Sequence, residues 1–265
     1  YGDPFHKFGV DHALHDCAIN HGPQGTLGLV ETVTSGISPV HQTRGWPDFP
    51  FWPTHNSLQH HQSYYKWIER AYLGGLRILV NHFTGSEVLC QINPQKQNAC
   101  DFEENWRLQY QRIHEMQNYI DAQNGGPGKG WFRIVDNPTD ARSVVEDGKL
   151  AVVLGIEISN LFDCKLTYQP ARTQTPAQED GSGGIENSYG CTVEEGQPNS
   201  ILTQMQRVHD WGVRQIISIH EFDNAFGGNG IFDGLVLNLG NRENSGGIPS
   251  GDVAEITGLL SGNLD

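Results

Sequence analysis

The hydrophobic residues of this chain form two long runs, and each run ends on a chemically reactive side chain. The first run is Leu150–Glu157 (LAVVLGIE) and the second is Val213–His220 (VRQIISIH). A near-continuous aliphatic segment needs cover on both faces, which is typical of a strand in a parallel sheet. In α/β barrels the reactive groups lie where such strands end. Glu157 and His220 are therefore the first candidate functional residues.

Shorter apolar segments predict two further strands, Leu76–Val80 and Phe132–Val135. A helix is predicted before every one of the four strands. Three of these helices show apolar residues three and four positions apart, and the one before Leu150 is indicated by its end signals, with Asn137 as N-cap, Pro138 at the first position and Gly148 just past the end. The predicted helices cover approximately residues 60–73, 106–120, 138–147 and 201–208. The repeated order of helix and then strand favours a parallel sheet with right-handed crossovers.

Four strands are fewer than the eight or so that a closed (β/α)₈ barrel requires. Residues 1–59 are rich in Gly, Pro, His and aromatic residues without a sustained period, and they predict a loop-rich N-terminal layer of the same domain. A stretch rich in Gln, Pro, Gly and Thr at about 164–198 predicts a surface insertion. The predicted fold is an α/β, TIM-barrel-like parallel β/α fold over residues 60–265, incomplete in this chain and with long loops; an open sheet is the alternative.

The composition argues against several classes of partner. Acidic residues outnumber basic residues 31 to 17, and the formal charge of −14 repels phosphate backbones and anionic lipid head groups. No apolar run approaches the ~20 residues that a membrane-spanning helix needs. The first residues, Tyr1–Pro4, lack the basic and apolar regions of a signal peptide. We therefore expect neither a nucleic-acid partner nor a membrane span.

Five cysteines are present, and their spacing predicts two local disulfides, Cys90 with Cys100 and Cys164 with Cys191. Cys17 is then left over, either unpaired or bound to something outside this chain. Disulfides are typical of exported proteins, so the prediction is a secreted or extracellular protein. The alternative is that all five thiols are reduced and buried.

Glu157 follows a run that buries its backbone, so an ionised carboxylate there needs a metal, another cation or a set of donors. A metal ligand meets this need, and the alternative is a carboxylate that caps a neighbouring loop amide or pairs with an arginine such as Arg77 or Arg214. His220 can bind a metal, donate to a substrate carbonyl or act as an acid or base, or it can be satisfied by backbone groups. The polar segment after it, Glu221–Gly228, is typical of an active-site βα loop.

The remaining motifs favour no other chemistry. The chain has 12 histidines but no H-E-x-x-H, C-x-x-C or zinc-finger spacing. It has no G-x-S-x-G nucleophile elbow, and the loop 125–130 lacks the order of a phosphate-binding loop. His82 follows the predicted strand Leu76–Val80, and we interpret it first as structural and second as a pocket residue.

Three segments, 67–80, 148–157 and 212–228, resemble bacterial secreted proteins related to the membrane dipeptidases, within the metal-dependent amidohydrolase superfamily. Shorter matches at Cys17, 21–25, 87–90 and 100–101 extend the resemblance over most of residues 15–240. Together these segments are specific to that group of proteins, although each one alone is a short match.

The resemblance implies a TIM-like barrel with one or two zinc ions at the carboxyl ends of its strands. Glu157 matches the metal-bridging glutamate of the family, and His220 matches the histidine that contacts substrate or metal; Asn224 is expected to join the substrate pocket. Two such ions hold a hydroxide and polarise the scissile carbonyl. The implied activity is metal-dependent hydrolysis of small peptide or amide bonds.

The chain departs from the family pattern in its other ligands. No His-x-His or His-x-Asp pair lies on a predicted strand, because Asp11-His12 and His15-Asp16 lie in loop-like sequence, and the two later histidine ligands are not found. One interpretation is a portion of a longer enzyme that associates with the rest of its own polypeptide or as a homo-oligomer. The other is a non-catalytic extracellular binding or self-assembling module.

Overall fold

The computed structural model describes residues 65–92, 96, 98–168, 187–189, 191–192, 194–228, 237, 240–242 and 244. These residues belong to two compact units. The first unit runs up to Leu79 and includes 94–97 and Gln111–Val152; the second unit includes 80–93, Asn98–Tyr110 and the residues from Val153 onward. The predicted N-terminal layer, 1–59, lies outside the described residues.

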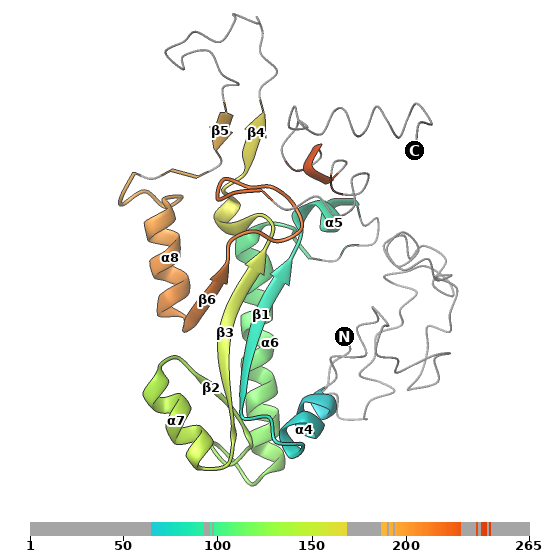
Figure 1. The fold of residues 1–265 in the computed structure, drawn as a ribbon, viewed down its shortest axis with the longest axis vertical. Coiled ribbons are helices and arrows are strands. Elements are labelled where there is room, and N and C mark those ends of the chain that lie inside the picture. Colours follow the sequence, from blue (N-terminus) through green and yellow to red (C-terminus); the bar gives the residue numbers. More distant parts are fainter. Residues whose placement is uncertain are drawn as a thin grey trace, which may run out of the picture. The chain divides into compact units, whose positions relative to one another are not determined.

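Helices and strands alternate along the described part of the chain, as the sequence predicts (Figure 1). The elements are α4 (Tyr65–Leu73), β1 (Ile78–Gly85), α5 (Glu87–Ile92), α6 (Phe102–Gln123), β2 (Phe132–Val135), α7 (Pro138–Glu146), β3 (Leu150–Ile158), the 3₁₀ turn η3 (Leu161–Asp163), β4 (Leu166–Tyr168), β5 (Asn187–Tyr189), α8 (Ile201–Asp210) and β6 (Val213–Ile217). All four predicted strands are confirmed, but several of their ends differ from the prediction. Strand β1 begins at Ile78 instead of Leu76 and continues to Gly85, β3 continues one residue further to Ile158, and β6 ends at Ile217 instead of His220. Helix α5 and strands β4 and β5 were not predicted.

The four predicted strands form one sheet with the order β1-β3-β2, and β6 also pairs with β3. The sheet is parallel. In the β3–β6 ladder Leu154 lies opposite Val213, and Glu157 lies opposite Ile217. The α/β class with a parallel sheet is therefore confirmed for the described residues.

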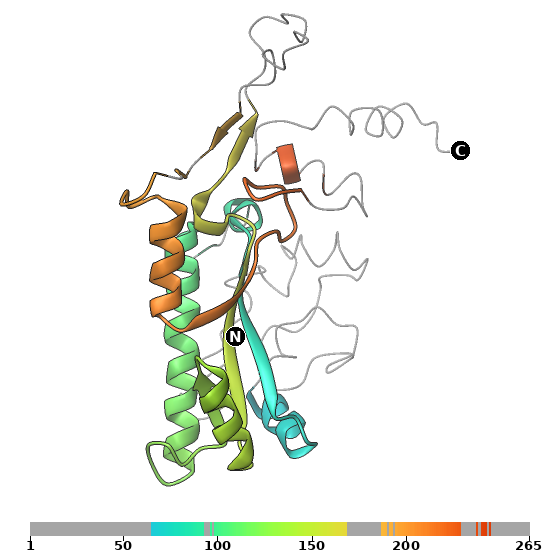
Figure 2. The ribbon, with the colours of Figure 1, turned by 60° about the vertical axis from the view of Figure 1, so that its left-hand side comes forward.

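The second unit buries one face of β3 completely. Leu154, Ile156 and Ile158 are fully buried, and Figure 2 shows α8 along the same side of the strands as α6. The alternate positions of β3 carry Gly155 and Glu157, and the Glu157 side chain is 28% exposed. The face of β3 with Leu154, Ile156 and Ile158 therefore forms the core, and the opposite face carries Glu157 as its polar side chain.

Helix α7 begins and ends where its sequence predicts. The side chain of Asn137 caps the helix by accepting a hydrogen bond from the Asp140 amide at 2.9 Å, and Pro138 occupies the first turn, where its missing N–H costs nothing. After the helix, Gly148 has a φ of +73°, a backbone conformation that favours glycine. These end signals place the start of β3 at Leu150.

Both predicted disulfides are formed, Cys90–Cys100 and Cys164–Cys191, and they are compatible with an extracellular location. The second one spans the predicted insertion at 164–198, within which β4 and β5 pair as antiparallel strands. Residues 169–186 of that insertion and Cys17 lie outside the described residues.

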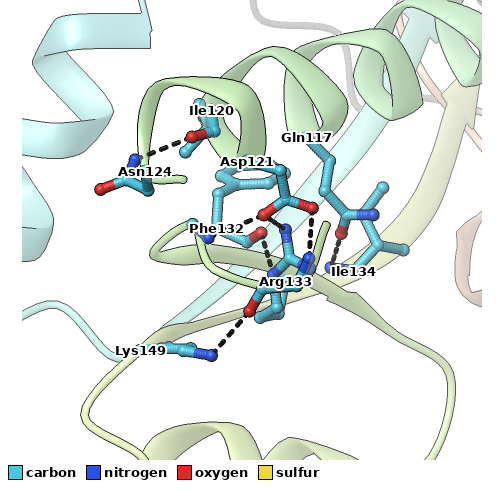
Figure 3. A network of polar contacts seen from close by, with 10 residues as sticks. Gln117, Ile120, Asp121, Asn124, Phe132, Arg133, Ile134 and Lys149 are labelled. Carbon is cyan, nitrogen blue, oxygen red and sulfur yellow. Dashed lines mark hydrogen bonds and ion pairs between the residues drawn. The ribbon is translucent and has the colours of Figure 1, made fainter. Parts of the chain in front are cut away.

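In the first unit, the carboxylate of Asp121 in α6 holds the loop that leads into β2 (Figure 3). Its Oδ1 accepts hydrogen bonds from the Gly130 amide at 2.7 Å and from Nη2 of Arg133 at 2.6 Å, and its Oδ2 accepts one from the Gly128 amide at 2.9 Å. The N–H groups of two glycines in the loop 125–130 therefore donate hydrogen bonds to a side chain of the protein itself. This agrees with the interpretation that the loop is not a phosphate site.

Candidate functional site

Three side chains with acid, base or metal-binding chemistry lie toward the carboxyl edge of the sheet in the second unit. Glu157 is the penultimate residue of β3, and His220 follows the end of β6 by three residues. Because the two strands are parallel and Glu157 pairs with Ile217, both residues lie at the same edge. His82 lies within β1, so the prediction that it follows the strand is wrong.

His82 contacts both neighbouring polar side chains. Its Nδ1 lies 3.6 Å from Oε2 of Glu157, and its Nε2 lies 3.1 Å from Oε1 of Gln215. The side chains of His82 and Glu157 are 22% and 28% exposed, so the pair is partly shielded from water. The structure thus brings residues of β1, β3 and β6 into one polar cluster, which we call the His82 cluster (His82, Glu157 and Gln215).

Gly155 makes this cluster possible. A Cβ at that position would overlap with Cδ2 of His82 and would lie 2.9 Å from its Nε2. The imidazole therefore lies directly against the backbone of β3 and reaches from β1 to Gln215 on β6. Any larger residue in place of Gly155 would clash with the His82 ring and prevent it from reaching Gln215 across β3.

The two arginines predicted as alternative partners of Glu157 donate hydrogen bonds to backbone carbonyl groups. Nη1 of Arg77 donates to the carbonyl oxygens of Tyr72 and Leu76. Nη1 of Arg214 donates to the carbonyl oxygens of His209 and Val213, at 2.7 and 2.8 Å. These bonds engage a guanidinium nitrogen of each arginine with the backbone, whereas Glu157 is within ion-pair distance of His82.

His220 is held through the residues that follow β3. Its Nδ1 lies 3.4 Å from Oγ of the fully buried Ser159. Asn224, 2% exposed, donates from Nδ2 to the carbonyl oxygens of Ser159 and Ser218 at 3.1 and 2.7 Å, and its Oδ1 accepts from the Phe226 amide. The carboxamide of Asn224 therefore ties the loop after β3 to the loop after β6. A substrate contact of Asn224 stays a prediction.

The turn after β3 has an unusual backbone that the sequence did not signal. Phe162 and Asp163 have φ values of 56° and 52°, which non-glycine residues rarely adopt. The ring of Phe162 packs edge-on against Phe102 with centroids 5.2 Å apart, and Oδ1 of Asp163 accepts bonds from the Phe102 amide and from Asn160. Burial raises the pKa of Asp163, and it outweighs the opposite effect of these two bonds. The loop that carries Ser159 is thus fixed by packing and hydrogen bonds.

The His82 cluster offers two donors that suit a zinc ion, an imidazole nitrogen and a carboxylate oxygen. Bond lengths of about 2.0–2.1 Å in a tetrahedral site place two ligands about 3.3 Å apart, close to the observed 3.6 Å. Within the described ranges, no group of three or more His, Cys, Asp or Glu side chains is arranged to hold a metal ion. Asp11-His12 and His15-Asp16 lie outside those ranges. The donors fit part of a zinc shell, and zinc stays a prediction.

Sequence reasoning missed the role of Gln215 and the place of His82. One signal was available, because Gln215 is a polar residue within an aliphatic run and pairs with Gly155 in the sheet. A polar side chain opposite a glycine leaves space for a third side chain between them. The strand order needed to identify that third residue is not visible in the sequence.

Comparisons with protein-family models, with curated proteins and with solved structures gave no match to this chain. Among the residues that the structure describes, no helix is both long and apolar enough to cross a membrane. The fold and the site therefore define this protein as an α/β protein with a parallel sheet and a polar cluster toward the carboxyl edge. The resemblance to dipeptidase-related proteins stays a prediction.

Proposed function

We propose that this protein is a metal-dependent hydrolase of the dipeptidase and amidohydrolase type that acts on small peptide or amide bonds. The observation that carries the proposal is the pair formed by His82 and Glu157, 3.6 Å apart, at the same edge of a parallel sheet as His220. Reactive groups at the carboxyl ends of parallel strands are typical of TIM-barrel enzymes, so we extend the proposal to a TIM-barrel-like fold.

In this proposal Glu157 holds a divalent ion, most simply zinc. Such an ion, when bound, polarises a carbonyl oxygen and lowers the pKa of its bound water. The carboxylate is partly buried beside an imidazole, so it has lost part of its hydration, and a bound cation would compensate for this loss. A neutral amide substrate suits an acidic protein, because the formal charge of −14 does not repel it.

His220 contacts the substrate in this proposal. Its Nδ1 faces Oγ of Ser159, so Nε2 is the nitrogen that can bond a substrate carbonyl or transfer a proton. Asn224 fixes the loop on which His220 lies by binding the carbonyls of Ser159 and Ser218. The secreted location is part of the same proposal and is supported by the two disulfides.

Hydrolysis of a set of dipeptides by the zinc-loaded protein tests the proposal. We expect activity in the wild type and a loss of about 10²-fold or more in kcat for both Glu157→Gln and His220→Asn, in line with acid–base and metal-assisted catalysis. Glu146→Gln, at an exposed position at the end of α7, is the matched control and should keep full activity. A wild type that hydrolyses no dipeptide at any zinc concentration would refute the proposal and favour a non-catalytic module.

A further inference from the structure

We infer that His82 is itself a metal ligand, through Nδ1, and that Gln215 selects the tautomer that makes this possible. The inference rests on the proposed function, because it concerns the same ion that Glu157 is proposed to hold. It adds a ligand from β1 and a supporting residue from β6, neither of which the sequence analysis assigned. Three features of the His82 cluster carry it: the tautomer of the ring, the separation of the donors and the fixed position of the ring.

The partner of Nε2 determines the tautomer of His82. A neutral imidazole has one N–H donor and one acceptor nitrogen. Nε2 faces Oε1 of Gln215 at 3.1 Å, and a carbonyl oxygen can only accept. With the Gln215 carboxamide in this orientation, the bond requires the ring proton on Nε2, which leaves the lone pair on Nδ1.

The lone pair of Nδ1 then faces a second acceptor. Oε2 of Glu157 lies 3.6 Å away, beyond the ~2.7–3.2 Å of a normal hydrogen bond and near the ~3.3 Å expected between two ligands of one zinc ion. Two acceptors on partly buried side chains repel each other unless a cation lies between them. Histidines that bind metals generally donate their other N–H to an oxygen acceptor, and Oε1 of Gln215 offers such an acceptor 3.1 Å from Nε2 of His82.

The position of the ring is fixed before any ion binds. The imidazole lies against the backbone of Gly155, where no Cβ could be accommodated, and it spans from β1 to β6. A ligand that is already oriented loses little conformational freedom when it binds. This rigidity distinguishes His82 from a histidine on a flexible surface position.

A second histidine provides the matched comparison. Nδ1 of His209 also lies 3.6 Å from a carboxylate oxygen, Oδ1 of Asp210, but both side chains are 61% exposed. If separation alone produced metal binding, both pairs would bind. We expect only the His82 cluster to bind a metal ion, because it is partly buried and its ring is oriented by Gln215.

The test is a titration of the metal-free full chain with Zn²⁺ by calorimetry, and with Co²⁺ followed by its visible absorption. We expect one ion bound in the wild type, with at least a tenfold loss of affinity for His82→Ala. Gln215→Met removes the acceptor and should weaken binding about 10–100-fold, whereas Gln215→Glu keeps an acceptor and should bind at least as well as the wild type. His209→Ala should not change the affinity.

Melting curves in EDTA show whether each variant folds. If His82→Ala does not fold, the comparison of Gln215→Met with Gln215→Glu still tests the inference. Equal affinity of the wild type and Gln215→Met, or of the wild type and His82→Ala, would overturn the inference. A wild type that binds no ion would also overturn it, because the cluster would then be a histidine–carboxylate pair without a metal. Metal binding that needs His82 without dipeptide hydrolysis would leave the inference standing and refute the proposed function.

Discussion

Replacement of Asp121 by asparagine should destabilise the protein strongly, although it changes only one atom of the side chain. The carboxylate is 6% exposed and accepts three hydrogen bonds, from two loop amides and from Arg133. Asparagine keeps one acceptor oxygen, and its NH₂ group then faces a donor. A hydrogen bond to a charged group contributes about 1.5–3 kcal/mol, and Arg133 would lose its charged partner. We therefore expect a loss of about 2–4 kcal/mol for Asp121→Asn.

The loss of stability in Asp121→Asn should also depend on pH. Burial on its own raises the pKa of Asp121, but the bonds from Gly128, Arg133 and Gly130 outweigh it and hold the pKa below its ordinary value. A carboxyl group with a lowered pKa in the folded state stabilises the protein above its unfolded pKa, and this stabilisation is lost as the pH falls through the folded pKa. The difference between wild type and Asp121→Asn should therefore be largest at neutral pH and shrink below about pH 4.

Urea unfolding followed by circular dichroism measures this difference, with Asp147→Asn as the control. Asp147 is an exposed carboxylate in the same unit, so its replacement should change the unfolding free energy by no more than about 0.5 kcal/mol. A loss below about 1 kcal/mol for Asp121→Asn at neutral pH, or a loss independent of pH, would refute the reasoning.

Three other predictions concern the second unit. Gly155→Ala should displace the His82 ring and cost about 1–3 kcal/mol, together with a loss of Zn²⁺ affinity; unchanged affinity in calorimetry would contradict the cluster geometry. Asn224→Ala leaves the buried carbonyl oxygen of Ser159 and the partly buried one of Ser218 without their donor and should cost about 2–3 kcal/mol in urea unfolding, and a loss near zero would show that Asn224 does not connect the two loops. A thiol count on the denatured, unreduced protein should give no more than one free thiol, because the two disulfides account for four of the five cysteines, and five would contradict both disulfides.

Strands, end signals and disulfides could be predicted because they depend on neighbouring residues. The aliphatic runs gave β3 and β6, and Asn137 with Gly148 gave the limits of α7. The spacing of the cysteines gave both disulfides. Each of these signals lies in a short segment of the sequence, so it can be recognised without knowing which distant segments contact each other.

The true end of β1 could not be predicted, because contacts distant in sequence determine it. The residues after Val80 include asparagine, threonine and glycine, which do not form an apolar strand pattern. The strand continues because the Ser159 amide donates to the carbonyl of Gly85, and because the Gln109 carboxamide bonds both the amide and the carbonyl of Thr84. This extension is what places His82 on the sheet beside Glu157.

The most direct test of the account is the position of zinc in crystals of the zinc-loaded protein, located by anomalous diffraction. We expect a peak about 2.0–2.2 Å from both Nδ1 of His82 and Oε2 of Glu157, at the carboxyl edge shared with His220. A peak bound to other residues, or no peak and a direct contact between the imidazole and the carboxylate, would contradict it.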